Sequence, residues 1–581
     1  MVLSFCMLLA NNVKICAQPT ISFSASDGNA LTVEDVEYTL MRYSSVDKSF
    51  NSSTSPFHAL IGGARAVGIS AFALRPILSV KGSVAEVAEG AFNNCPLLSS
   101  VELPSTQVIG NLSFAGCPSL TRVLFPAVDV VTEGAFLKCD NLYDVSFPVA
   151  HTIEAGAFAQ CPKLVLLNFP EVLHIEACAF MDCTSLTDNV EFPQVTYIWR
   201  EAFLNCTSLT AIKCPKLKSL STRVFANCKS LIFVTAPELE AIGRSAFWDC
   251  ESLFKNIPRS LYESLVDFKK VKELDVQAFW GCSSIKVMDL PAVETIGEGA
   301  FKNCSSLEYV YCPNIKKIEA SAFGGCSALM EIVCPAVVTI GAEAFSDCSS
   351  LFYIDFSKVT TVGVGAFNAC AALDTLKLPK CASIEMGAFT NCTSLQAARL
   401  SVIQSIGMMA FANCPNLKYV SFGAGHTKAQ IIRLEMAIFG YGTYGSNVRS
   451  SSGIELVLGE YVLPKPTNNS WNGYTWNSIT VVPAEGISGI KEVIKNGAVD
   501  IYPNPAKETA TVNFELEKAG DVKIALVDMS GKEVTAVYKG FTPAGMFIKT
   551  FGTGHLPAGV YLLNILIDGD TIVKKIVLRR D

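Results

Sequence analysis

The amino-acid sequence predicts a mostly β protein in which a right-handed solenoid of about 16 coils precedes a small antiparallel β-sandwich. Three observations lead to this fold. Ala-Phe or a close variant recurs between Phe72 and Phe411, and thirteen of the fifteen steps are 22 or 23 residues long. Fifteen of the sixteen phenylalanines are followed by Cys three residues later. After residue 497 the repeat and the cysteines stop, and short alternating apolar segments replace them. A unit of this length cannot close a core alone, but stacked units bury a continuous one.

Composition narrows the classes of function. The 581 residues are 50% hydrophobic and 17% charged, which excludes disorder as the main state. The net charge of −7 and the lack of a Lys/Arg block argue against nucleic acid as a partner. The mean hydropathy is +0.35, yet no apolar run is long enough for a transmembrane segment, so we expect none in the mature chain.

Each repeat unit predicts two short extended segments. In the unit that begins at Phe136, Val145 and Phe147 alternate as in a strand, and Pro148 ends it because proline cannot donate to a sheet ladder. An Ile-Gly pair or a variant of it then begins a second extended or turn segment. We expect positions nine and eleven after each Phe to point inward, and positions eight and ten outward. At the usual spacing of strands, sixteen coils would make a rod of about 75 Å.

The 22 cysteines are explained mainly by the repeat. Fifteen occupy the position three residues after Phe, and seven do not: Cys6, Cys16, Cys178, Cys214, Cys312, Cys334 and Cys381. We expect the fifteen to form an inward ladder of free thiols, since free cysteine packs as a small hydrophobe. Stacked Cα atoms about 4.8 Å apart lie within disulfide range, so some disulfides remain an alternative. A metal site is disfavoured, because one row of thiols does not give tetrahedral ligation. We expect no metal and no cofactor.

The repeats resemble a known family. Blocks such as IGEGAFKNCSSLEYVYCP (296–313) and IGAEAFSDCSSLFYIDFS (340–357) resemble the BspA-like class of leucine-rich repeats, LRR_5, which is common in surface proteins of Bacteroidota. The resemblance covers roughly residues 60–425. It implies a leucine-rich repeat solenoid at 61–424 and says little about the ligand.

The segments around the repeats are expected to cap or export the array. Residues 18–60 hold no good repeat and are expected to cap the first coil. Residues 425–483 end in SWNGYTWNSITVV and resemble the Trp-containing segments that close other arrays of this class. Residues 1–17 look like most of a signal peptide without its basic start, with a hydrophobic cap as the alternative. Residues 484–497 are expected to form a linker.

Residues 498–581 differ in kind from the repeats. Alternating segments separated by turn signals predict the antiparallel sandwich. They resemble the type A C-terminal sorting domain of the type IX secretion system. The resemblance implies contact with that machinery, passage across the outer membrane, and a secreted or cell-surface location. An ordinary adhesion-type sandwich is the alternative. The motif residues are Tyr502, Pro503, Asn504, Pro505, Gly531, Gly559, Tyr561, Lys574 and Lys575.

No catalytic constellation is visible in the sequence. The five histidines lie at different repeat phases or outside the array, and there is no G-x-S-x-G, H-E-x-x-H or phosphate-binding loop. We therefore expect no enzyme and name no catalytic residue. The sequons at Asn205, Asn303 and Asn391 follow from the repeat consensus and carry no separate information.

Binding is the better hypothesis. The outward strand positions form a candidate surface rich in Tyr and then in basic residues, and aromatics and Arg dominate interface hot spots. The alternative is that Tyr simply suits an exposed strand. Ten extra residues between Cys250 and Phe279 are either a loop on the binding face or tolerated drift. The candidate ligand-binding residues are Phe233, Tyr309, Tyr311, Tyr353, Asp355, Lys377, Arg399 and Tyr419.

These observations together predict an adhesin-like function. We expect an exported cell-surface protein that binds host extracellular-matrix proteins or bacterial surface proteins through its solenoid. The alternatives are a non-adhesive structural protein of the surface layer and, less favoured, an enzyme that processes a polymer.

Overall fold

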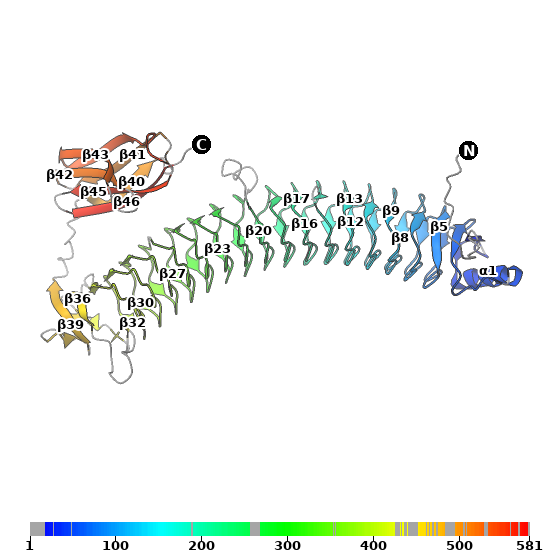
Figure 1. Cartoon of the computed structure of the whole chain (residues 1–581), viewed down its shortest axis with the longest axis horizontal. Helices are drawn as coiled ribbons and strands as arrows, with labels where there is room; N and C mark the ends of the chain where they lie inside the picture. Colours follow the sequence, from blue (N-terminus) through cyan, green and yellow to red (C-terminus); the bar gives the residue numbers. More distant parts are fainter. Residues whose placement is uncertain are drawn as a thin grey trace, which may run out of the picture. The chain divides into compact units, whose positions relative to one another are not determined.

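The computed structural model of the chain describes most of residues 18–578 (Figure 1). Contacts divide the chain into two compact units, one made by most of the residues up to Thr480 and one by most of those after it. The predicted signal segment, 1–17, lies outside the described residues. So do 27, 48, 188–189, 256–267, 353, 355, 424–429, 432, 435–437, 440–450, 460–461, 464, 468–469, 472–473, 483–493, 503–505, 507, 517, 528–532, 558, 568–569 and 579–581.

The larger unit is a parallel β-solenoid of about 17 turns, as predicted. Most coils give one strand to a first face, where neighbouring strands of the same sheet pair parallel and a residue faces its equivalent one repeat later, as Tyr309 faces Glu331. The strands of the first face are β1 (Thr20–Phe23), β3 (Phe57–Ile61), β5 (Ile77–Gly82), β7 (Ser100–Glu102), β9 (Arg122–Leu124), β11 (Asp144–Ser146), β13 (Leu166–Asn168), β15 (Val190–Glu191), β17 (Ala211–Lys213), β19 (Phe233–Thr235), β22 (Val287–Asp289), β24 (Tyr309–Tyr311), β26 (Glu331–Val333), β29 (Thr375–Lys377), β31 (Ala397–Leu400) and β33 (Tyr419–Phe422).

A second face is built from strands of two residues each. Its strands form a four-stranded sheet from β2 to β8 and a fourteen-stranded sheet from β10 to β35. These strands are β2 (Ala30–Leu31), β4 (Ala66–Val67), β6 (Glu86–Val87), β8 (Val108–Ile109), β10 (Val130–Val131), β12 (Thr152–Ile153), β14 (His174–Ile175), β16 (Tyr197–Ile198), β18 (Ser219–Leu220), β20 (Ala241–Ile242), β21 (Glu273–Leu274), β23 (Thr295–Ile296), β25 (Lys317–Ile318), β27 (Thr339–Ile340), β28 (Thr361–Val362), β30 (Ser383–Ile384), β32 (Ser405–Ile406) and β35 (Arg433–Leu434).

The core is a continuous column of phenylalanine rings. The sixteen repeat phenylalanines from Phe72 to Phe411 stack face to face, with centroids 5.1–5.6 Å apart and planes within 20° of parallel. The step from Phe247 to Phe279, which carries the extra residues, has the same ring spacing, 5.2 Å. Stacked units therefore share one core, as the repeat predicts.

Both ends of the array extend its sheets. At the N-terminal end β1 pairs with β3 and β2 with β4, so one coil precedes Phe72. Helix α1 (Val33–Val46) follows β2 and begins at a capping box in which Thr32 and Asp35 bond each other's backbone amides. At the other end β36 (Ser451–Gly459) pairs with β33, and Trp476 packs edge-on against Phe439. The remaining strands there are β34 (Gln430–Ile431), β37 (Val462–Leu463), β38 (Ser470–Trp471) and β39 (Tyr474–Val482).

The smaller unit consists of two antiparallel sheets around one apolar core, consistent with the predicted sandwich. One sheet has the order β40-β41-β44 and the other β43-β42-β45-β46. Alternate residues of β41 are buried, as its alternating sequence predicts. The strands are β40 (Ile494–Tyr502), β41 (Thr509–Leu516), β42 (Gly520–Val527), β43 (Glu533–Thr542), β44 (Gly545–Gly552), β45 (Gly559–Ile567) and β46 (Asp570–Leu578).

Candidate ligand-binding surface

The fifteen repeat cysteines form a buried ladder of thiols inside the array. Each Sγ lies 3.0–3.2 Å from the carbonyl oxygen of the Phe one coil earlier, as Cys304 does from Phe279, and donates to it. The sequence predicts the burial but not this hydrogen bond. The fifteen ladder cysteines are free thiols buried in the array, as the ladder prediction expects. Cys6 and Cys16 lie outside the described residues.

Burial lowers the reactivity of ten of the ladder thiols. It raises the pKa of ten ladder thiols above the ordinary value, so they stay protonated near neutral pH. Because the thiolate is the metal ligand and the nucleophile, these positions suit packing rather than chemistry. Within the described part of the chain, no cluster of three or more His, Cys, Asp or Glu side chains could hold a metal ion.

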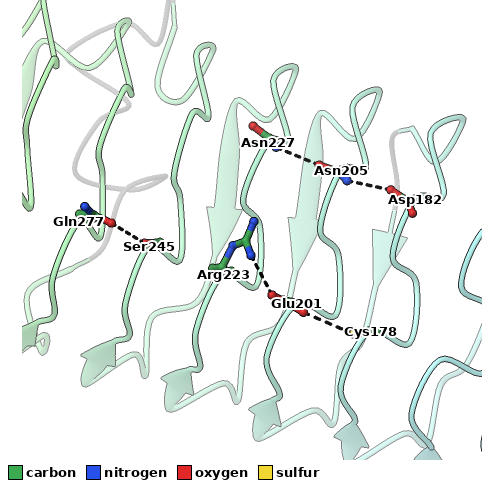
Figure 2. Close-up of polar contacts among 8 residues, drawn as sticks. All are labelled: Cys178, Asp182, Glu201, Asn205, Arg223, Asn227, Ser245 and Gln277. Atoms are coloured by element: carbon green, nitrogen blue, oxygen red, sulfur yellow. Dashed lines mark hydrogen bonds and ion pairs between the residues drawn. The ribbon is translucent and has the colours of Figure 1, made fainter.

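In the coils from Phe180 to Phe279, the turns before and after Phe carry polar ladders (Figure 2). In one, Asn205 donates to Asp182 at 2.8 Å and accepts from Asn227 at 2.9 Å. These side chains stand two residues after Phe, where the backbone is left-handed, with φ of 62° at Asn205. Asn tolerates that conformation better than most residues. The sequon asparagines Asn303 and Asn391 share this position and conformation, which explains them as part of the repeat.

A second ladder runs two residues before Phe, also at left-handed positions. The Glu201 carboxylate lies 3.7 Å from the Cys178 thiol and 3.0 Å from the Arg223 guanidinium (Figure 2). Ser245 and Gln277 bond at 3.2 Å across the coil that carries the extra residues. These side chains are engaged between coils, so the two strand faces remain the surfaces for a ligand.

The predicted ligand-binding residues of the first face, called the stripe below, fall into separate clusters. Tyr309 and Tyr311 lie on β24 and are both half-buried, while Val310 between them is fully buried, which confirms the predicted alternation. Phe233 stands apart on β19, and no described strand of the first face lies between β19 and β22. Residues 256–267, which include most of the extra segment, and two candidate residues, Tyr353 and Asp355, lie outside the described residues.

The basic residues at the C-terminal end of the stripe lie on neighbouring strands. Lys377 on β29 faces Arg399 on β31, and the Arg399 guanidinium lies 5.7 Å from the ring centroid of Tyr419 on β33. This distance suits a cation–π contact, which fixes the guanidinium over an aromatic face. The sequence reasoning therefore found residues that meet in space here, although it did not predict the stacking of Arg399 on Tyr419.

A hollow on the second face was missed by the sequence reasoning. Its volume is about 900 Å³, and it runs from β18 to β25. Its lining residues are Ser219, Leu220, Ala241, Ile242, Gly243, Glu273, Leu274, Asp275, Glu294, Thr295, Ile296, Gly297, Asn314, Lys316, Lys317 and Glu319. A hollow of this size is ordinary for a ligand site. The available signal was the small residues Ser219, Ala241 and Thr295 at one repeat position, with Gly243 and Gly297 two residues further on.

The described motif residues of the tail lie on β40, β45 and β46, two of them at strand ends. Gly559 begins β45, and the Tyr561 hydroxyl donates to the Pro557 carbonyl at 3.1 Å. Lys574 lies on β46, paired with Leu563, and Lys575 pairs with Leu562. Tyr502 ends β40, while Pro503, Asn504, Pro505 and Gly531 lie outside the described residues.

The histidines do not converge on one site in the described part of the chain. His58 bonds Ser79 at 2.7 Å, His151 bonds Asp129 at 2.5 Å, and His555 bonds Thr535 at 3.2 Å, all on different elements. His426 lies outside the description. No described helix has the length and apolar character needed to cross a membrane.

Comparison with known families identifies both units. The family described as BspA-type leucine-rich repeat region matches the chain at residues 71–187, 174–263, 259–339 and 316–431. The family described as secretion system C-terminal sorting domain matches residues 500–579. The first match spans more than half of the chain, and the second nearly all of the smaller unit. No curated protein matches the chain.

Several solved structures are similar over the array. A leucine-rich repeat protein from Bacteroides ovatus is 23% identical, with 52% of this chain and 86% of that chain covered and a TM-score of 0.33. A leucine-rich cell surface protein from Faecalibacterium prausnitzii is 21% identical, with coverage of 61% and 82% and a TM-score of 0.26. A leucine-rich repeat protein from T. pallidum is 25% identical, with coverage of 35% and 79% and a TM-score of 0.23.

Proposed function

Because the chain belongs to the family of BspA-type leucine-rich repeat proteins and ends in a secretion-system sorting domain, we propose that it is an adhesin-like binding protein. The sorting domain indicates export and a place at the cell surface, and it implies contact with the type IX secretion machinery. The proposed ligands are host extracellular-matrix proteins or surface proteins of other bacteria.

The observation that carries this proposal is the cluster of Lys377, Arg399 and Tyr419 on the first face, together with Tyr309 and Tyr311. Arg, Tyr and Trp supply most interface hot spots, because they bury a large area and still form directed polar contacts. A solenoid sheet offers such side chains in a regular row on an extended surface. Phe233, Tyr353 and Asp355 belong to the same proposed surface by repeat position.

A variant of the stripe tests the binding proposal. We expect Tyr309→Ala combined with Tyr353→Ala in the full chain to weaken capture by immobilised matrix proteins at least about tenfold, because each truncated hot-spot side chain typically costs more than about 1 kcal/mol. Surface plasmon resonance measures the change. Tyr143→Ala removes a tyrosine that is 48% exposed and outside the stripe, and it should leave capture unchanged.

The same experiment separates the alternatives. A non-adhesive surface-layer protein would assemble with copies of itself and show no saturable capture. An enzyme would turn over a polymer, and neither result is expected here. Equal capture by the stripe variant and the wild type would remove the first face from the proposal.

Deletion of the tail tests the export proposal. We expect loss of residues 498–581 to retain the protein inside the cell, since the sorting domain is the part that the secretion machinery would recognise. Immunofluorescence on intact cells, set against total protein in lysates, measures display. Normal display of the truncated chain would contradict the proposal. Intact folding of the array, checked by circular dichroism, serves as the control.

A further inference from the structure

The hollow on the second face has a floor of small side chains. Ser219, Ala241 and Thr295 occupy the outward position of their strands, and Gly243 and Gly297 follow the strands β20 and β23. A Cβ at Gly243 would lie 2.7 Å from the Leu220 carbonyl oxygen of the neighbouring coil. These glycines therefore allow the coils to approach closely and place no side chain in the hollow.

Two carboxylates rise from the middle of this floor. Glu273 belongs to β21 and Asp275 follows it, and both stand between the small residues of β20 and β23. A carboxylate offers two acceptor oxygens. Hydroxyl groups of Ser219 and Thr295 and the amide of Asn314 add further donors and acceptors to the lining.

A pair of aromatic rings, one half-buried and one exposed, lies beside the hollow. Tyr197 on β16 faces Ser219 of the hollow in the strand register, and Trp199 follows directly after the strand ends. Their ring centroids are 6.1 Å apart and their planes are at 84°. Trp199 is 46% exposed, so one side of its ring is accessible to a ligand.

The charges of this face mostly balance one another. Immediately before the short strands, successive coils carry Lys218, Glu240, Lys272, Glu294 and Lys316, a column of alternating sign. Backbone hydrogen bonds of 2.9 Å from Glu240 to Lys218 and from Lys272 to Glu240 place neighbours side by side. At the far end Lys317 and Glu319 form an ion pair of 2.8 Å. The lining side chains include four carboxylates and two ammonium groups, so their net charge is negative, which disfavours a polyanionic ligand.

We propose that this hollow, together with the Tyr197–Trp199 pair, binds a neutral oligosaccharide. The negative ring faces attract the polarised C–H groups of a sugar, while carboxylate, amide and hydroxyl groups bond its hydroxyls. From β16 to β25 the surface extends about 24 Å, which fits an extended chain of several sugar units. The site is separate from the first face and does not depend on the proposed protein ligands.

A peptide is the less suitable occupant. An extended peptide needs backbone partners of the kind that a sheet edge provides. The backbone amides of this floor are already engaged between coils, as Gly243 N–H is with the Leu220 carbonyl at 2.9 Å and Gly297 N–H is with the Leu274 carbonyl at 2.8 Å. The groups that remain for a ligand are side-chain hydroxyl, carboxylate, amide and ammonium groups.

The test uses the full chain and an array of neutral glucose, mannose and N-acetylglucosamine oligosaccharides, each about 24 Å long. We expect saturable binding to at least one of them. Tryptophan fluorescence and calorimetry measure this binding. Trp199→Ala should weaken it roughly tenfold through loss of the stacking face. Ala241→Trp should abolish it by filling the hollow; β16 already carries Tyr197 at this strand position, so the fold accommodates a large ring there.

Matched variants keep the outcomes distinct. Tyr143→Ala, an equally exposed aromatic outside the hollow, should bind the sugar as the wild type does. Tyr309→Ala should likewise leave sugar binding intact even if it reduces protein capture. The proposal is overturned if no neutral oligosaccharide binds, if Trp199→Ala and Ala241→Trp bind as the wild type does, or if Trp199→Ala lowers the capture of matrix proteins instead.

Discussion

Raising the pH above about 9 is expected to unfold the solenoid steeply. Burial raises the pKa of ten ladder thiols, Cys304 and Cys326 among them, so they remain protonated in the native array. In the unfolded chain the same thiols ionise near their ordinary pKa of about 8.5. A group whose folded pKa is raised gives stability that is complete below the unfolded pKa and is lost as the pH rises. Each thiol therefore removes about 1.4 kcal/mol per pH unit above that value.

The size of this pH-dependent loss sets the pH at which the array should unfold. Three adjacent coils, with one such thiol each, lose about 4 kcal/mol of the free energy of unfolding per pH unit. Some 66 residues of an ordinary domain have a free energy of unfolding of only roughly 3 to 10 kcal/mol in total. Circular dichroism and thiol titration should thus show cooperative unfolding near pH 10 and unreactive ladder thiols at pH 7. Cys304→Ala combined with Cys326→Ala should flatten the dependence by about 2.7 kcal/mol per pH unit. Constant stability from pH 8 to 10.5 would contradict the argument.

Phe301→Ala is expected to cost about 3–5 kcal/mol of the free energy of unfolding. The Phe301 side chain is fully buried and stacks on two rings, Phe279 and Phe323, each with its centroid 5.3 Å away. Truncation removes both stacking contacts and leaves a cavity in the centre of the array. The neighbouring coils cannot collapse into it, because their backbones are fixed by hydrogen bonds such as that from Phe301 N–H to the Ala322 carbonyl at 2.8 Å.

Urea unfolding followed by circular dichroism measures this loss. Because each coil contacts only its neighbours, the variant should also divide the transition into two, one for the coils on each side of the defect. Tyr143→Ala is the control, since its exposed ring should change stability by less than about 0.5 kcal/mol. A single transition with less than about 1 kcal/mol lost would mean that the ring column is not the main support of the array.

The repeat made the solenoid predictable, and the reason is physical. A step of 22 residues returns each Phe to the same place, so the spacing of Phe92, Phe114 and Phe136 in the sequence already predicts the ring column. The outward and inward positions of β24 could be predicted because three consecutive residues are enough to show a period of two. The free thiols followed from the same argument, since one interior position recurs in every coil.

The hollow on the second face could not be predicted from the sequence in the same way. Its strands contain two residues, too few to show an alternation, and its hollow depends on which small residues meet across five coils. Trp199 and Gly243 are 44 positions apart, and only the stacking of β16, β18 and β20 brings their coils together. The hydrogen bond from Cys304 to Phe279 likewise joins different coils, so hydropathy alone gave the burial of the thiol and not its partner.

The coil with the extra residues has a consequence for how such a gene can change. Phe247 and Phe279 stack with centroids 5.2 Å apart, within the range of the other repeats, and β20 still pairs with β21, although 32 positions separate the two rings. The column and the second face therefore stay in register across the coil that holds the added sequence. Because the same core positions recur in every coil, whole coils can be added to or removed from such an array without new kinds of core residue. Repeat number thus sets how far the surface extends.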